Sequence, residues 1–212
     1  MNIQNESLQE LQHIKKMMER STKFSSISGF SAIAAGICAL MGIWVVVKEI
    51  ATWKEQHLDN LTANKDELAT QLLLTAVVTF SAAVVTSFIF VYLRCKKLGI
   101  PVLGMSARRV IINIAIPLFV GALFIFRLAT LGSYELITPA CLIFYGLALI
   151  NASKYTLSEI KHLGFIELGI GIINLWILGY GLILWGIGFG LMHIIYGILI
   201  WWKYERNDLP GY

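Results

Sequence analysis

Two ionisable side chains stand alone in a long apolar stretch, and they are the best candidates for chemistry in this sequence. Between Leu163 and Trp202, only Glu167 and His193 titrate at or below neutral pH. One straight helix over these residues would be about 60 Å long, roughly twice the hydrocarbon core of a bilayer. The stretch must therefore fold back on itself. Gly179-Tyr180-Gly181 predicts the turn, so we expect a transmembrane hairpin.

The hairpin places its two ionisable groups at similar depth. Glu167 lies 14 residues before Gly181 and His193 lies 12 after it, so their depths differ by about 3 Å at helical rise. We expect them within hydrogen-bonding or one-water distance, in the cytoplasmic half of the membrane. Asn174 is expected deeper on the same face. An unpaired charge here would cost several kcal/mol, which predicts a partner for each group.

Three interpretations of this polar site stay open. It could be an inter-helix clamp that fixes the register of the hairpin. It could be a proton or ligand site, to which intramembrane ionisable groups usually point. Alternatively, Glu167 lies near enough to the boundary to reach interfacial water or Lys161. Further hydroxyls could come from Tyr145, Tyr180 and Tyr196.

Glycines recur on the same helical faces as the polar residues. In the last apolar segment, Gly186, Gly190, His193 and Gly197 are spaced four, three and four apart; in the segment before it, Gly164, Glu167, Gly171 and Asn174 are spaced three, four and three apart. Such spacings keep each set on one face, and small residues four apart let membrane helices approach closely. We predict that the two glycine-lined faces meet.

Enzymatic and nucleic-acid functions find little support. The histidines are scattered, without HxxxH or HExxH spacing, and no nucleophile motif or phosphate loop is present. Basic and aromatic residues are not interleaved as in nucleic-acid-binding proteins. Cys38, Cys95 and Cys141 have no metal-type spacing. We therefore predict no catalytic residue, no metal site and no cofactor.

Composition indicates lipid as the solvent for most of the chain. The sequence is 57% hydrophobic and 14% charged, against about 25% charged in soluble domains. Six apolar segments predict an all-α bundle of six transmembrane helices, occupying residues 25–204 between an amphipathic helix at 1–24 and a short tail at 205–212. The expected spans are Ser28–Val47, Leu72–Leu93, Val110–Leu131, Ile137–Ala152, Leu163–Leu178 and Leu182–Trp202.

The basic residues predict the orientation. Thirteen of the 17 fall on one side of this scheme: Lys15, Lys16, Arg20, Lys23, Arg94, Lys96, Lys97, Arg108, Arg109, Lys154, Lys161, Lys203 and Arg206. The positive-inside rule then places both termini in the cytoplasm. The loop from Arg94 to Arg109 either only sets this topology or also contacts anionic lipid.

The N-terminal segment is expected to be an amphipathic helix. Its apolar face carries Leu8, Leu11, Ile14, Met17 and Met18. This face could lie on the inner leaflet, dock a cytoplasmic protein or a second copy, or pack beneath its own bundle. Membrane lipid and a cytoplasmic partner are thus the partners that the sequence suggests.

A faint internal repeat links two parts of the chain. Gly29-Phe30, Gly36-Ile37 and Leu40 match Gly164-Phe165, Gly171-Ile172 and Leu175 at a constant offset of 135, and Tyr145-Gly146 parallels Tyr196-Gly197. In these matches Ala32 stands where Glu167 does, and Leu142 where His193 does. Glycine-rich helices can match by chance; a genuine repeat would indicate duplicated hairpins.

Two segments together resemble a known family. They are Met17-Met18-Glu19-Arg20-Ser21 through Ala35-Gly36, and Trp185-Gly186-Ile187-Gly188-Phe189-Gly190 through Lys203-Tyr204-Glu205-Arg206. They resemble an uncharacterised family of small multi-pass membrane proteins of Bacteroidetes-type bacteria. The resemblance implies a bacterial cytoplasmic (inner) membrane and no particular activity.

Our leading functional hypothesis is a non-enzymatic membrane protein that senses, scaffolds or regulates, with its N-terminal helix contacting a partner. The alternative is a small transporter or proton-coupled carrier that uses Glu167 and His193. A water-filled cavity at these residues would favour the carrier, and a dry, glycine-packed seam would favour the first hypothesis.

Overall fold

The computed structural model describes residues 27–56 and 65–206, and within these ranges the chain is helical with no strand. Both the N-terminal segment 1–24 and residues 207–212 of the tail lie outside the described residues. The elements are α2 (Gly29–Gln56), α3 (Lys65–Leu98), α4 (Met105–Thr130), η1 (Tyr134–Leu136), α5 (Ile137–Ala152), η2 (Ser153–Tyr155), α6 (Ser158–Trp176), α7 (Gly181–Trp185), η3 (Gly186–Met192), α8 (His193–Ile200) and η4 (Trp201–Glu205). Because η3 and η4 are π-helical, α7 to η4 form one helix with locally widened turns. The predicted all-α class is confirmed.

The described helices are those expected of a membrane protein. Among the described residues, five helical segments are long and apolar enough to cross a membrane: Gly29–Gln56, Glu67–Leu98, Met105–Thr130, Tyr134–Tyr155 and Gly181–Glu205. Large apolar side chains point outward, and Phe126 and Trp176 are 70% and 85% exposed. Monomeric proteins in water rarely expose a continuous apolar surface of this size. Helix α6 is not one of these five segments, because its 19 residues include three charged side chains, Glu159, Lys161 and Glu167.

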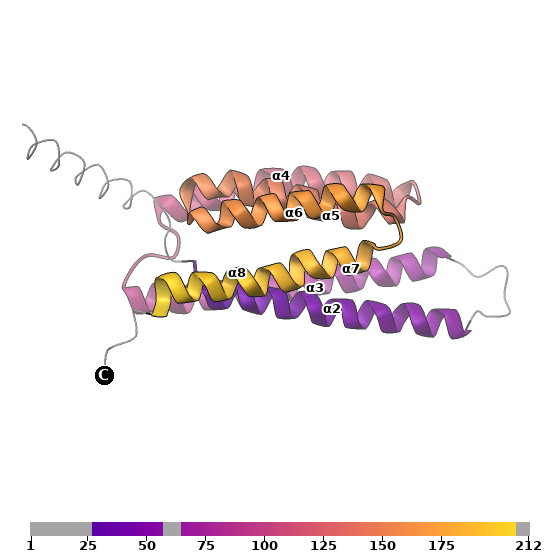
Figure 1. Ribbon diagram of the computed structural model, residues 1–212, viewed down its shortest axis with the longest axis horizontal. Coiled ribbons are helices and arrows are strands. Elements are labelled where there is room, and N and C mark those ends of the chain that lie inside the picture. Colours follow the sequence, from indigo (N-terminus) through magenta and orange to yellow (C-terminus); the bar gives the residue numbers. More distant parts are fainter. Residues whose placement is uncertain (1–26, 57–64, 207–212) are drawn as a thin grey trace, which may run out of the picture.

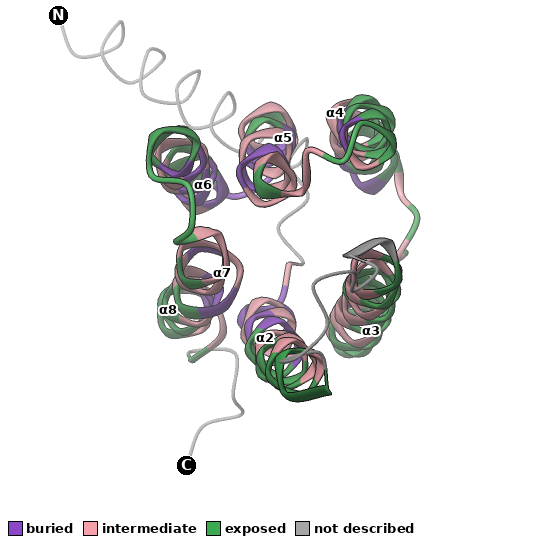
Figure 2. Ribbon diagram, turned by 90° about the vertical axis from the view of Figure 1, so that its right-hand side faces the viewer, coloured by how far each residue is buried: buried purple, intermediate pink, exposed green. Residues whose placement is uncertain are grey.

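The described helices form two layers, one made of α4, α5 and α6 and the other of α2, α3 and the α7–α8 segment (Figures 1 and 2). Helix α5 packs between α4 and α6 in one layer, and α2 packs between α3 and the α7–α8 segment in the other. Successive helices run in opposite directions (Figure 1). The start of α2 and the end of η4 therefore lie at the same end of the bundle, where the backbone N–H of Gly29 donates a hydrogen bond to Glu205. We call this the terminal end.

The prediction that the two glycine faces meet each other is wrong. A Cβ atom built on Gly164 or Gly171 would collide with α5, at Ile150 and Ile143 respectively. Built on Gly190 or Gly197, or on Gly186, it would collide with α2. Each face thus contacts a helix of its own layer. The periodicity of a sequence defines the buried face of a helix, but it does not name the helix that covers that face.

The same close crossing occurs once in each layer. A Cβ on Gly197 would lie 2.7 Å from the carbonyl oxygen of Gly29, and a Cβ on Gly146 would lie 2.7 Å from that of Gly164. Gly29 and Gly164 are the pair related by the offset of 135, and Gly146 and Gly197 belong to the second match. The residues of the faint repeat therefore occupy equivalent places in two crossings, where backbone approaches backbone and only glycine fits.

Candidate functional site

The predicted turn brings the two ionisable groups into one place. Helix α6 ends at Trp176, and α7 begins at Gly181. Between them Gly179 has φ +96°, a left-handed backbone conformation that glycine adopts without steric penalty. The chain reverses here, as predicted, and carries α7, η3 and α8 back past α6 (Figure 1). Glu167 of α6 thereby faces His193 at the start of α8.

Glu167 and His193 are buried as a pair. The distance from His193 Nδ1 to Glu167 Oε1 is 3.4 Å, and the two side chains are 6% and 0% exposed. Two further groups hold the imidazole ring: Nδ1 lies 3.1 Å from the carbonyl oxygen of Gly188, and Nε2 lies 2.7 Å from the hydroxyl of Tyr145. A carbonyl oxygen can only accept, so Nδ1 carries a hydrogen. In the neutral ring, Nε2 then accepts from Tyr145.

The carboxylate of Glu167 is less well satisfied than the imidazole. Neither of its oxygens has a hydrogen-bond partner, although both are buried. The backbone of Gly188 packs directly against it, since a Cβ atom built on Gly188 would collide with Glu167 Oε2. A bare carboxylate in such surroundings costs several kcal/mol. The geometry offers two places for a single proton: on Glu167 beside a neutral imidazole, or on Nε2 in an ion pair, where the Tyr145 hydroxyl would accept.

The helix opposite Glu167 is irregular at this point. Gly186–Met192 form the π-helical turn η3, which contains Gly188 and Gly190 and ends where His193 begins α8. Because Gly188 has no side chain, its backbone lies against Glu167 and its carbonyl can be reached by the His193 ring. Single π-helical turns of this kind are frequent at functional sites.

Asn174 is buried on the same face of α6 but belongs to a separate contact. Its Nδ2 donates to the hydroxyl of Thr138 at 3.2 Å, while its Oδ1 is buried without a partner. Seven residues of helix separate it from Glu167, which is about 10 Å. The interpretation that Glu167 reaches interfacial water or Lys161 is wrong, because Glu167 is fully buried and Lys161 lies over the ring of Phe165.

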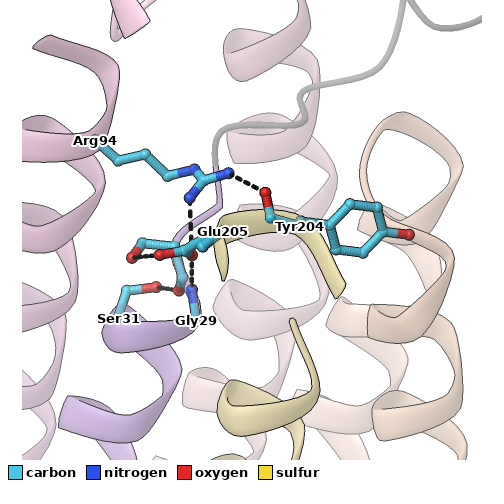
Figure 3. Close-up of polar contacts among 6 residues, drawn as sticks. Gly29, Ser31, Arg94, Tyr204 and Glu205 are labelled. Carbon is cyan, nitrogen blue, oxygen red and sulfur yellow. Dashed lines mark hydrogen bonds and ion pairs between the residues drawn. The ribbon is translucent and has the colours of Figure 1, made fainter. Parts of the chain in front are cut away.

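A second, partly buried carboxylate lies at the terminal end of the bundle (Figure 3). Arg94 of α3 forms an ion pair with Glu205 of η4 at 3.0 Å and donates to the backbone carbonyl of Tyr204 at 3.4 Å. Glu205 also accepts from the backbone N–H of Gly29 and from the hydroxyl of Ser28. It thus caps the first turn of α2. We call the contacts of Glu205 with Arg94, Gly29 and Ser28 the terminal clasp.

Side chains of η4 also bond to the start of α6. Lys203 and the hydroxyl of Tyr204 both bond Glu159, in the first turn of α6 and ahead of its apolar segment. Burial raises the pKa of Glu159, but the bonds from Lys203 and Tyr204 outweigh it, so the net pKa lies below the ordinary value. A lowered pKa means that these bonds stabilise the fold above pH 4.5 and that their contribution is lost as the pH falls further.

Residue patterns alone did not identify all of these groups. Tyr145 was one of three candidate hydroxyls, and the match of Tyr145-Gly146 to Tyr196-Gly197 was the only signal that set it near a helix crossing. Arg94 was counted only among the basic residues that set topology, and no role was predicted for Glu205. They are 111 positions apart in sequence, and no local pattern relates them.

Among the described residues, no group of three or more His, Cys, Asp and Glu side chains is arranged to hold a metal ion. Comparison with protein-family models, with curated proteins and with solved structures found no match for this chain. Among the described residues, the candidate site is therefore the cluster of Glu167, His193 and Tyr145.

Proposed function

We propose that this chain is a six-span protein of a bacterial cytoplasmic membrane that responds to protons as a non-enzymatic sensor or regulator. Helix α6 is the span that this proposal adds to the five long apolar segments, since it packs along α5 and its Glu167 is internal. The excess of basic residues at the terminal end, including Arg108, Arg109 and Lys154, supports cytoplasmic termini. The segment 1–24 would supply the contact with a cytoplasmic partner or a second copy.

The observation that carries the sensor proposal is the unsatisfied carboxylate of Glu167. The layers meet at this residue, which contributes no hydrogen bond to the fold. When the site binds one proton, Glu167 and His193 together have no net charge. When the proton leaves, a buried carboxylate faces a neutral imidazole at a cost of several kcal/mol. Raising the pH therefore favours separation of α6 from η3, which is the change that a partner would detect.

Hydrogen–deuterium exchange in lipid nanodiscs tests this mechanism. After correction for intrinsic rates, peptides over 181–200 are expected to exchange faster at pH 8 than at pH 6. In Glu167→Gln, a permanently neutral side chain, this difference should disappear. Glu159→Gln removes a carboxylate from the same helix outside the pair and should leave the difference intact. Equal pH dependence in Glu167→Gln and the wild type would refute the proposal.

A proton-coupled carrier is the second candidate, favoured by the π-helical turn beside the carboxylate. The enclosure of the pair argues for the sensor, because Glu167 and His193 are 0% and 4% exposed. Proteoliposomes loaded with a pH-sensitive dye distinguish the two. Under the sensor proposal, an imposed pH gradient decays no faster than in empty liposomes. Faster decay that Glu167→Gln abolishes would establish the carrier instead.

A further inference from the structure

A hollow lies between α2 and α3, at the end of the bundle remote from the terminal clasp. Its volume is about 550 Å³, within the usual range for small-molecule sites. It is lined by Trp44, Val45, Lys48, Glu49, Thr52, Trp53 and Gln56 of α2 and by Glu67 and Gln71 of α3. The lining thus combines two indole rings with two carboxylates and a single lysine.

Glu49 is the most informative residue of this lining. Its Oε1 accepts a hydrogen bond from the hydroxyl of Thr75 at 2.8 Å, which fixes the carboxylate on the inner side of the hollow. Its Oε2 is buried and has no hydrogen-bond partner among the residues that the structure describes. Along α3, Gln71 lies one helical turn from Thr75, and Glu67 lies two turns from it, near the start of the helix. A carboxylate oxygen is thus fixed beside the hollow with its acceptor capacity unused.

The lysine shows which chemistry the aromatic lining supports. Lys48 Nζ lies 3.9 Å from the centroid of the Trp44 ring. The ammonium group of Lys48 therefore already makes a cation–π contact with one indole ring of the hollow. Trp53 and the two carboxylates offer a second cation the same kind of surroundings. A metal ion is disfavoured, because indole rings do not ligate hard cations and two carboxylates are few for such a site.

From these contacts we propose that the hollow binds an organic ammonium ion with an apolar body. Its charged nitrogen would lie beside Glu49, with Glu67 as a more distant negative charge, and its apolar part against Trp53. The same chemistry is available from a soluble organic cation and from the ethanolamine headgroup of a phospholipid. This site is separate from the Glu167–His193 pair and does not depend on the proposed sensing function.

The test titrates benzyltrimethylammonium into the full-length protein in a neutral detergent and follows binding by calorimetry. Saturable binding is expected. Loss of the fixed carboxylate in Glu49→Gln should weaken it about tenfold or more, as a lost charge contact predicts. Glu55→Gln, an exposed carboxylate of the same helix that does not line the hollow, should bind as the wild type does. The neutral isostere neopentylbenzene should not compete.

A second variant keeps the test decisive if Glu49→Gln folds poorly. Glu67 is exposed at the mouth, so Glu67→Gln leaves the fold intact and should weaken binding about threefold, as expected for a more solvated charge. In nanodiscs, competition by phosphatidylethanolamine but not phosphatidylglycerol would identify a lipid headgroup as the natural source, and equal affinity in both a soluble cation. Absence of saturable binding, or wild-type affinity in the glutamate variants, would overturn the proposal.

Discussion

Glu167 and Glu205 are both carboxylates removed from solvent, yet their surroundings are opposite. Glu205 is 9% exposed and has the guanidinium of Arg94 at 3.0 Å, with the Gly29 N–H and the Ser28 hydroxyl as further donors. Glu167 is 0% exposed and has only an imidazole at 3.4 Å, with neither oxygen hydrogen-bonded. Burial alone therefore does not indicate a structural role: a satisfied carboxylate holds helices together, and an unsatisfied one is a candidate for function.

The largest loss of stability is expected at the terminal clasp. Glu205→Ala removes the partner of Arg94 and the cap of α2 together, which should lower the unfolding free energy by about 3 kcal/mol. Denaturant titration in micelles measures this value. The neighbouring exposed charge gives a matched control, and Arg206→Ala should change stability by less than about 0.5 kcal/mol. Equal effects of the two variants would show that the clasp contributes nothing.

At the buried pair, the histidine is expected to matter more for stability than the glutamate. His193→Ala leaves a cavity and removes the partner of the Tyr145 hydroxyl, so it should cost about 2 kcal/mol. The same denaturant titration applies. Ile195→Ala truncates a partly exposed side chain two positions away and should cost less. A smaller loss for His193→Ala than for Ile195→Ala would contradict the described hydrogen bonds.

Tyr145→Phe isolates one of those bonds. The phenyl ring keeps the contact with Phe189, whose ring centroid is 4.9 Å away, so only the hydrogen bond to His193 is lost. We expect a cost of about 1 kcal/mol. Tyr180→Phe, at the exposed turn between α6 and α7, is the control and should be silent. Identical unfolding midpoints for both variants would show that the Tyr145 hydroxyl stabilises nothing.

The smallest effect on stability is expected for Glu167→Gln. No hydrogen bond of the carboxylate is lost, so the change at neutral pH should stay within about 1 kcal/mol in either direction. This variant should nevertheless lose the pH response of the 181–200 peptides. Glu205→Gln, which weakens an ion pair and a cap, should destabilise more. If the order of the two glutamine variants is reversed, the contrast between the two carboxylates fails.

Much of the site followed from spacing along single helices. The three-and-four spacing around Glu167 defined a face that the structure buries completely, since Gly164, Glu167, Gly171 and Asn174 are all buried. The glycines at 179 and 181 defined the turn, and equal distances from that turn brought Glu167 and His193 to one level. These are local properties, and the helical repeat determines them.

The pairing of helices could not be predicted in the same way. Several segments carry glycine-lined faces, and any two of them could pack closely, so spacing does not decide whether Gly197 meets Gly164 or Gly29. The faint repeat contained a better guide, because it related Gly29 to Gly164 and Gly146 to Gly197. The terminal clasp left no trace in sequence, since a charge at a helix end indicates topology whether or not it finds a partner.

The position of Glu205 in the chain has a consequence for biosynthesis. Glu205 is translated 177 residues after Ser28, an interval of about 10 to 35 s at ordinary elongation rates. During that time α2 has already left the ribosome, while the side chain that caps its amino-terminal end does not yet exist. Closure of the layer that contains α2 and α3 is therefore a late event, because it requires η4, which is synthesised long after α2.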